Sequence, residues 1–599
     1  MPSLFRRRTR RWSLLAGIGA CVAVLVTPGA LAAPGPEAEV TVGSNDLVFS
    51  QNKQNEPIVA VNPNDHDQVA AGANDNIDLE ACNAAADNTC PFTPGVGVTG
   101  FQGSTDGGVG WEQPEYTGFS ARDACLGEPG PDDPACAPDE DGPIGTLPWY
   151  FENDVVSFGD PVQTWGPVPG PDGSFSWDNG ARLYFSNLTF NFPGEAAFRG
   201  GGAIGVSRTD DFAAALAGDK GAWMDPVLAS GKMGATDFSD KEWIVADDAA
   251  SSPFFGNVYA CWVEFRSLGA GPEPVTVARS TDGGDTWKQR QISQAANTVS
   301  PRASGRQGCQ VDTDSDGVLY VFWLGGDPRT GEAVHLMSRS FDGGVSFERP
   351  ARPVATIEEC GRFDPVQRRF TFDGIAGART NSFPSVSIAN GAPTGDGPDT
   401  IVMTWCDGLT PSDSSPGPNE RALVQFSTDK GETWSEPVSA SLLTDRPDFP
   451  AIAISPDGED VYLTYMAFHA PWQSTTAAPR MFEGVVLHAD FADSVLGPFA
   501  EAHRGEPGDA RASSANGLAF EFLGDYNAVS ATNDFGVAVW NDAREALDCP
   551  AIDEYRQALA DGEDATAPAP QVDCNPPDPE TTLFGNTDIW AERVEDPTP

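Results

Sequence analysis

The chain has 599 residues, and its 87 Asp and Glu against 36 Lys and Arg give a formal net charge of −51. Gly 64 and Pro 51 are abundant, yet 40% of the residues are apolar, and 15 Trp and 34 Phe can build a large core. This composition excludes a disordered polyampholyte, a collagen-like chain and a coiled coil. The acidic balance makes nucleic acid and anionic membranes poor partners and is compatible with Ca²⁺ as a ligand.

Residues 1–32 are predicted to be an export signal. A basic stretch between Arg6 and Arg11 precedes an apolar run over residues 12–26, and Ala30-Leu31-Ala32 supplies a cleavage pattern. Thr9-Arg10-Arg11 resembles a twin-arginine signal imperfectly, so the Sec and Tat routes both stay open. A retained anchor is disfavoured because the apolar run is short for a membrane span. We expect residues 33–599 to be secreted as one domain, monomeric and without a membrane span.

Ten cysteines remain after removal of the signal with Cys21, an even number that suits an oxidising compartment. Three pairs lie close in sequence beside Pro- or Asp-rich stretches and are predicted disulfides: Cys82 with Cys90, Cys125 with Cys136, and Cys549 with Cys574. Two of these pairs belong to expected surface loops over residues 120–145 and 545–582. Proximity alone pairs Cys261 with Cys309 and Cys360 with Cys406. There is no CxxC or HxxxH spacing, which argues against a zinc enzyme.

A short motif, S-x-D-x-G-x-x-W/F, occurs four times, at residues 104–111, 280–287, 340–347 and 427–434, with a decayed copy at 207–210. The motif is typical of a β-hairpin tip. The Asp carboxylate accepts backbone N–H groups across the turn, Gly provides positive φ, and the aromatic ring enters the core. Four near-identical copies indicate a repeat architecture.

Between the hairpins, an apolar strand and a β-rich strand ending in an aromatic residue recur, mostly 60 to 80 residues apart. Such a spacing suits a four-stranded sheet, and repeated sheets that cannot bury both faces alone stack radially. We therefore predict an all-β propeller of about seven blades, with six as the alternative because the second unit is weak. Residues 39–50 are expected to close the ring beside the last unit. One Trp per unit is expected in the core: Trp243, Trp262, Trp323, Trp405 and Trp540.

The hairpins resemble the Asp boxes of sialidase-like, BNR-repeat propellers, above all secreted actinobacterial proteins labelled exo-alpha-sialidase. The resemblance is also carried by Asn55-Glu56-Pro57-Ile58, Asp240-Lys241-Glu242-Trp243-Ile244, Gly524-Asp525-Tyr526 and Trp540-Asn541-Asp542-Ala543-Arg544. In that family three arginines bind the sialate carboxylate, a Tyr–Glu pair provides the nucleophile and an Asp is the acid/base. The first arginine belongs to an F/Y-R-I-P motif. This chain departs there, because Glu56 stands at the arginine position.

Residues just before each inner strand should ring the mouth of the propeller channel. They are Glu56, Asp240, Arg306, Arg379, Arg446, Asp525 and Tyr526. By the resemblance, Tyr526 is the candidate nucleophile, Glu242 or Glu264 accepts its proton, and Asp75 is the candidate acid/base. Substrate binding is then assigned to Arg306, Arg379, Arg446, Glu56 and Asp525. The alternative is that these residues form Asp–Arg bridges that close the channel and fix the order of the blades.

Asp312, Asp314 and Asp316, with Gly317, match the opening of a calcium loop. The twelfth position holds Trp323 instead of Glu, so an ordinary Asp/Gly-rich turn is the competing interpretation.

Two functions follow from these observations. The first is a secreted exo-glycosidase that removes terminal sialic or other acidic sugars by a retaining mechanism, with no required cofactor and Ca²⁺ as an option. The second is a non-catalytic propeller that binds glycan, cell wall or protein.

Overall fold

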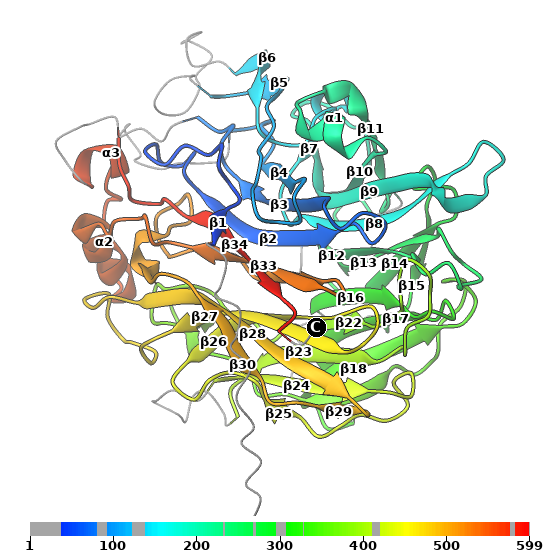
Figure 1. Ribbon diagram of the computed structural model, residues 1–599. Helices are drawn as coiled ribbons and strands as arrows, with labels where there is room; N and C mark the ends of the chain where they lie inside the picture. The colour runs from blue at the N-terminus through cyan, green and yellow to red at the C-terminus, as the bar shows by residue number, and fades with distance from the viewer. Residues whose placement is uncertain are drawn as a thin grey trace, which may run out of the picture.

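The computed structural model describes residues 37–80, 93–122, 138–231, 234–267, 271–294, 307–327, 329–409, 420–574 and 581–597. Within these ranges, seven antiparallel sheets form the blades of a β-propeller, which confirms the predicted fold and blade number (Figure 1). The inner strands of successive blades contact one another around the ring. No helix of the described ranges is long and apolar enough to span a bilayer.

The first four blades follow the chain from the inner strand outward. Blade 1 contains β2 (Gln54–Val61), β3 (Val69–Asp75) and β4 (Thr99–Ser104). Blade 2, the weak repeat, contains β7 (Val155–Ser157), β8 (Val162–Pro169), β9 (Phe175–Asn191), β10 (Ala203–Thr209) and β11 (Trp223–Leu228). Blade 3 contains β12 (Phe238–Ala246), β13 (Val258–Phe265), β14 (Val275–Ser280) and β15 (Lys288–Gln291). Blade 4 contains β16 (Gln307–Thr313), β17 (Leu319–Gly326), β18 (Ala333–Ser340) and β19 (Arg352–Thr356).

The remaining blades close the ring. Blade 5 contains β22 (Ser385–Ile388), β23 (Ile401–Asp407), β24 (Arg421–Ser427) and β25 (Val438–Ser439). Blade 6 contains β26 (Arg446–Ile454), β27 (Asp460–Phe468), β28 (Met481–Ala492), β29 (Val495–Leu496), β30 (Ala500–Arg504) and β31 (Gly508–Asp509). Blade 7 contains β32 (Ala528–Ala531), β33 (Phe535–Asp542), β34 (Asp588–Glu595) and, as its outer strand, β1 (Ala38–Glu39). Of the predicted closing segment, 39–50, only the first residue lies in that strand.

Short elements decorate the ring. Two hairpins, β5 (Tyr116–Ser120) with β6 (Asp139–Ile144) and β20 (Arg362–Asp364) with β21 (Arg369–Thr371), lie outside the blades. Helix α1 (Phe212–Leu216) belongs to blade 2, and α2 (Pro550–Ala560) and α3 (Pro570–Asp573) lie at the rim (Figure 1). The stretch 545–582, expected to be a loop, therefore carries two helices in its described part.

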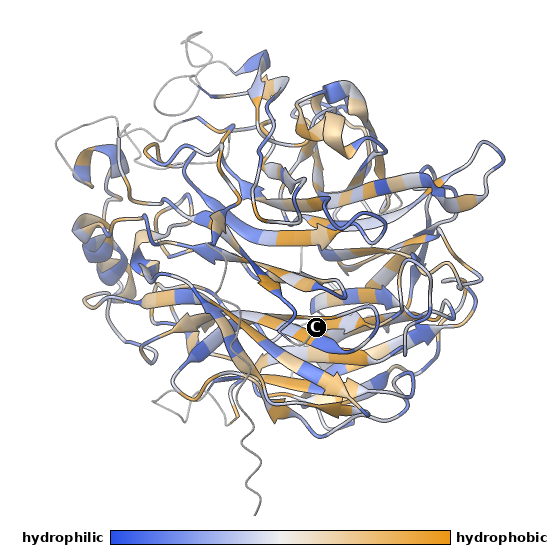
Figure 2. Cartoon of the chain, viewed as in Figure 1, coloured by the Kyte–Doolittle hydropathy of each residue, from blue (hydrophilic) through white to orange (hydrophobic). Residues whose placement is uncertain are grey.

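The core lies between adjacent sheets, because strands β13, β23, β27 and β33 are buried along their whole length and therefore on both faces of their sheets. Figure 2 shows apolar stretches along the strands of the blades. Between blades 3 and 4, for example, Tyr259 and Val263 pack with Leu319 and Trp323. Trp262, Trp323, Trp405 and Trp540 are at most 1% exposed, which confirms their expected core position. Trp243 is only partly buried and lines the channel.

The four motif copies form one and the same turn, which we call the repeat turn. In each, the Ser hydroxyl donates to the Asp carboxylate at 2.7 to 2.9 Å and accepts the amide of the second turn glycine at 2.9 Å. The same carboxylate accepts a further amide four residues after the Asp, at 2.7 to 2.9 Å. The motif thus satisfies the backbone of a turn that no sheet hydrogen bonds reach.

Each repeat turn is also held by the preceding blade. An arginine of that blade donates to a carbonyl oxygen of the turn: Arg182 to Gly283, Arg279 to Gly343, Arg339 to Lys430, and Arg593 to Gly107. Four turns on four different blades therefore lock to their neighbours in the same way, including the junction between blade 7 and blade 1.

Three disulfides lie in the described ranges: Cys261–Cys309, Cys360–Cys406 and Cys549–Cys574. The first joins blade 3 to blade 4, and the second joins blade 5 to the segment that precedes it. The third joins the start of α2 to the end of α3. Cys82, Cys90, Cys125 and Cys136 lie outside the described residues.

Candidate functional site

A pocket lies at the end of the channel where the inner strands begin. Asp160, Lys241, Gly308, Phe449 and Asp525 line it from five different blades. Its volume is about 50 Å³, which is room for a few water molecules or one small polar group. The sheets are built to converge here, because each inner strand starts at this end.

The inner strands share an unusual backbone feature at the pocket. Residues Glu56, Asp160, Lys241 and Phe449 have φ between 48° and 56°, and Gly308 and Gly524 occupy the corresponding places with φ of 55° and 82°. In β2, β12, β16 and β26 a register shift marks a β-bulge at this point. The bulge turns the side chain at its centre toward the channel axis. Non-glycine residues in the left-handed region are strained, and such strain clusters at functional sites.

Lys241 lies at the centre of the charged groups. Its Nζ is 2.5 Å from Asp525 Oδ2, 2.9 Å from Asp160 Oδ2 and 3.5 Å from Glu56 Oε1. Burial lowers the pKa of Lys241, but the surrounding carboxylates raise it well above its ordinary value, so the ammonium is charged. One cation thus joins carboxylates from blades 1, 2 and 7.

Arg379 is the second cation of the site. Its Nε and Nη2 bind the two oxygens of Asp525 at 2.6 and 2.7 Å, and Nη2 also lies 3.1 Å from Glu56 Oε1. The guanidinium stacks on Phe522, with 4.5 Å between its carbon and the ring centroid. The Nε and Nη2 edge of the arginine is therefore occupied by protein carboxyl groups.

The site holds more carboxyl groups than these two cations can neutralise. Burial, and then the charge of Asp160, raises the pKa of Glu56 and of Glu242, and burial raises that of Asp240. Glu56 also shares a hydrogen bond with Asp160, as a protonated carboxyl does with a carboxylate. These three carboxyl groups therefore bind a proton more readily than a carboxyl group in water does, while Lys241 and Arg379 form ion pairs with Asp160 and Asp525.

Glu242 is the group with the least protein support. It is 4% exposed and lines the pocket, and neither of its carboxyl oxygens has a hydrogen-bond partner among the described residues. A buried polar group without a partner costs about 1–3 kcal/mol. When it is protonated, a carboxyl in this position has a proton to give and no hydrogen-bond acceptor among the described residues.

Tyr526 lines the same pocket, but its phenol donates a hydrogen bond to the carbonyl oxygen of Pro161 at 3.0 Å. Burial, followed by the charges of Glu56, Asp160, Glu242 and Asp525, raises the pKa of Tyr526 well above its ordinary value. The phenolate that a nucleophile requires is therefore strongly disfavoured, and Glu242 makes no hydrogen bond with the phenol.

The structure thus brings Glu56, Asp240, Glu242, Arg379, Asp525 and Tyr526 together at the mouth, and it places three other predicted residues elsewhere. Arg446 is 1% exposed, binds both oxygens of Glu420 at 2.8 Å and stacks on Phe372. It fails to reach the pocket because Phe449, three residues later, occupies the bulge of that strand. Arg306 lies outside the described residues.

Asp75 is also placed away from the pocket. Its carboxylate accepts hydrogen bonds from Gln54, Gln113 and the amide of Ile77 at 2.8 to 3.0 Å, fully buried within blade 1. Glu264 pairs with Arg266 at 3.0 Å instead of Tyr526. Within the described ranges one predicted arginine reaches the cluster, so the three-arginine arrangement is not formed there, and the alternative of Asp–Arg bridges describes Arg379 better.

Sequence reasoning missed Asp160 and Lys241 as members of the site. Both residues belong to the strand motifs of the sequence. Asp160 precedes a proline, as Glu56 does, and Lys241 lies between two acidic residues. Each of the two residues occupies the equivalent position of its blade, and this equivalence could have identified both as members of the site. It becomes clear only from the register of the inner strands.

The predicted calcium loop holds a lysine. Lys430 Nζ lies 3.0 Å from Asp314, 2.8 Å from Asp316 and 3.1 Å from Asp399. Asp314 also accepts the amide of Val318 and the phenol of Tyr320, as an Asp-rich turn does. Asp312 instead lines the channel and accepts the amide of Thr313. The turn interpretation accounts for all these contacts.

No protein-family model matches the sequence, and no curated protein matches it. Among solved structures, the chain is similar to the alpha-L-arabinofuranosidase of Fusarium graminearum, with 10% identity over 81% of this chain and 98% of that one, at a TM-score of 0.36. It is similar to the Trypanosoma rangeli sialidase in complex with sialic acid, with 12% identity over 73% and 57% and a TM-score of 0.38. It is also similar to the phage phi92 endosialidase, with 10% identity over 94% and 69% and a TM-score of 0.39. At these identities the likeness concerns the propeller architecture alone.

Proposed function

We propose that the pocket at the channel mouth is the active site of a glycoside hydrolase that acts on a terminal, uncharged sugar. The observation that carries this proposal is Glu242, a carboxyl that lines the pocket with no hydrogen-bond partner among the described residues and whose pKa burial raises well above its ordinary value. An acidic sugar is disfavoured, because Arg379 is already paired with Asp525 and Glu56.

In this mechanism Glu242 donates its proton to the leaving oxygen as the glycosidic C–O bond breaks. Asp160 is the ionised carboxylate that acts on the anomeric carbon, directly or through a water, which finally supplies the hydroxyl of the product. We assign this role to Asp160 and not to Asp525. Asp160 forms an ion pair with Lys241, whereas Asp525 pairs with both Lys241 and Arg379. Lys241 fixes the position of Asp160 through their ion pair. Retention of the anomeric configuration stays a prediction. Identification of the first-formed anomer by ¹H NMR tests it.

The test is hydrolysis of chromogenic glycosides of neutral sugars, beside a sialoside, by the purified mature chain. We expect turnover of a neutral glycoside, with about 10²–10⁴-fold lower kcat in Glu242→Gln and in Asp160→Asn. Glu264→Gln is the matched control, since Glu264 is a buried carboxyl paired outside the pocket. Equal turnover by wild type and Glu242→Gln would contradict the proposal, and so would turnover of the sialoside alone.

A second candidate is glycan binding without hydrolysis. It is favoured by the mutual pairing of Lys241, Arg379 and Asp525, which makes the mouth a closed ionic network. A glycan array would then detect a ligand that is not cleaved, and Glu242→Gln would leave its affinity within about threefold of wild type. Loss of turnover in Glu242→Gln favours the enzyme over this candidate.

A further inference from the structure

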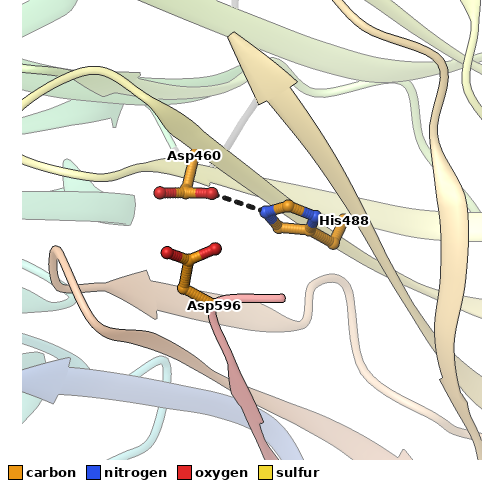
Figure 3. Close-up of side chains that lie close together, drawn as sticks. All are labelled: Asp460, His488 and Asp596. Atoms are coloured by element: carbon orange, nitrogen blue, oxygen red, sulfur yellow. Dashed lines mark hydrogen bonds and ion pairs between the residues drawn. The ribbon is translucent and has the colours of Figure 1, made fainter. Parts of the chain in front are cut away.

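A second cluster lies at the opposite end of the propeller. Inner strand β26 runs away from the pocket, and Asp460 begins β27 just after the turn that follows it. His488 lies on the neighbouring strand β28 of the same blade, and Asp596 directly follows β34 of blade 7. His488 Nε2 lies 2.7 Å from Asp460 Oδ1, and one ligand atom from each of the three residues lies within 4.8 Å of the others (Figure 3).

Tyr462 gives a second, independent observation. It stands on the same side of β27 as Asp460, two residues later, and is directly paired with His488 on β28, with 5.1 Å between the ring centroids. Its side chain is fully buried, and its hydroxyl has no hydrogen-bond partner among the described residues. A buried hydroxyl left in this way is accounted for by an ion or a water molecule bound beside it.

We propose that Asp460, His488 and Asp596 bind one divalent cation of the zinc class. An imidazole with two carboxylates suits Zn²⁺, whereas Ca²⁺ and Mg²⁺ prefer oxygen ligands alone. Three protein ligands leave a fourth tetrahedral position for a water or for the hydroxyl of Tyr462. A surface groove lined by Asp457, Asp460 and Asp490 gives the ion a path to the cluster.

The ion would have a structural role, because it would join blade 6 to blade 7. Blade 7 contains both β1 and β34, so it is the blade at which the ring closes. Binding through Nε2 of His488 would replace its hydrogen bond with Asp460, and the neutral imidazole would then carry its proton on Nδ1. The cluster lies at the other end of the strands from Glu242 and Asp160, so it takes no part in the proposed hydrolysis.

The experiment uses the mature chain, stripped with EDTA and then given ZnCl₂, CaCl₂ or MgCl₂. We expect one zinc per chain by mass spectrometry of the metal content, and a Tm that rises with zinc concentration and not with calcium or magnesium. His488→Gln and Asp596→Asn should lose both effects. His469→Gln, at a surface histidine with 44% of its side chain exposed, should retain both.

Two results would overturn the proposal: no retained zinc in the wild type, or zinc binding and stabilisation unchanged in His488→Gln and Asp596→Asn. Asp596→Asn keeps the side-chain volume at a partly exposed position, so it should fold. Co²⁺ gives a readout on the unmodified chain. A tetrahedral visible spectrum with one equivalent supports the site, and an octahedral spectrum identical to that of free Co²⁺ contradicts it.

Discussion

At the residue scale, the site depends on three strained positions in consecutive blades. Glu56, Asp160 and Lys241 each have positive φ, where most side chains are disfavoured. Their mutual ion pairs hold them there, since the ammonium of Lys241 reaches both carboxylates. The bulge that causes the strain also aims the side chains at the axis, so the strain and the site have one structural cause.

Replacement of Lys241 by Met should destabilise the protein by about 3–5 kcal/mol at pH 8, because it leaves buried carboxylates without their cation. The loss should shrink as the pH falls to 5.5, because Glu56, whose pKa burial raises, then takes up a proton more readily and no longer needs the ammonium. Chemical denaturation at both pH values measures this. Lys288→Met, at an exposed position of β15, is the control. Equal losses for the two variants would contradict the central role of Lys241.

At the element scale, the repeat turn joins one blade to the next. The second glycine of the turn needs its small size as well as its positive φ. A Cβ on Gly284 would lie 2.8 Å from Arg208 and 3.2 Å from Tyr184 of blade 2, and one on Gly344 would lie 3.2 Å from Tyr259 of blade 3. The turn therefore packs on the neighbouring blade while an arginine of that blade binds its carbonyl.

Arg339→Met tests this junction. Arg339 is 2% exposed, donates to the carbonyl of Lys430 at 2.6 Å and also binds Glu348 and Glu432. We expect a loss of about 2–3 kcal/mol in the free energy of unfolding, because the turn of blade 5 loses a charged donor. Arg329→Met, whose side chain is 82% exposed, should stay within about 0.5 kcal/mol of wild type. If Arg339→Met were as stable as the Arg329→Met control, the contact of Arg339 with the turn would contribute nothing to the free energy of unfolding.

At the scale of the whole molecule, many carboxyl groups are buried in an acidic protein. Burial, first of all, raises the pKa of Asp247 to about 8, of Glu592 to about 7, and of Asp75 and Asp248 to about 6. A carboxyl whose pKa is higher in the folded state gives stability that is present at low pH and is lost as the pH rises through that pKa. Repulsion at a net charge of −51 acts in the same direction.

The Tm should therefore be higher at pH 5.5 than at pH 8, by differential scanning calorimetry. His335 has the opposite effect below pH 6.5. Burial lowers its pKa to about 4, so the folded state favours the neutral imidazole, and stability falls as the pH falls from 6.5 toward 4. Asp247→Asn should flatten the profile, since the proton of Asp247 contributes over this whole range. A Tm that rises from pH 5.5 to pH 8 would show that these carboxyls are ionised in the folded protein.

Local patterns were enough for the fold. Hairpin tips, strand alternation and one Trp per unit depend on contacts within a few residues of the chain, so the amino-acid pattern alone reveals them. The candidate site was predictable only in part. Glu56, Glu242, Arg379, Asp525 and Tyr526 were expected at the mouth and lie there. Arg446 was assigned by its place before a strand, and the bulge at Phe449 turned it away.

By itself, the sequence determined the all-β class, the propeller and the residue types available at its mouth. The tertiary structure alone decided which of those residues meet, because a one-residue bulge in four of the seven inner strands selects the side chain that faces the axis. It also decided that Asp460, His488 and Asp596 form a cluster, although no spacing in the sequence links them. The stacking of blade 7 on blade 6 brings these residues together.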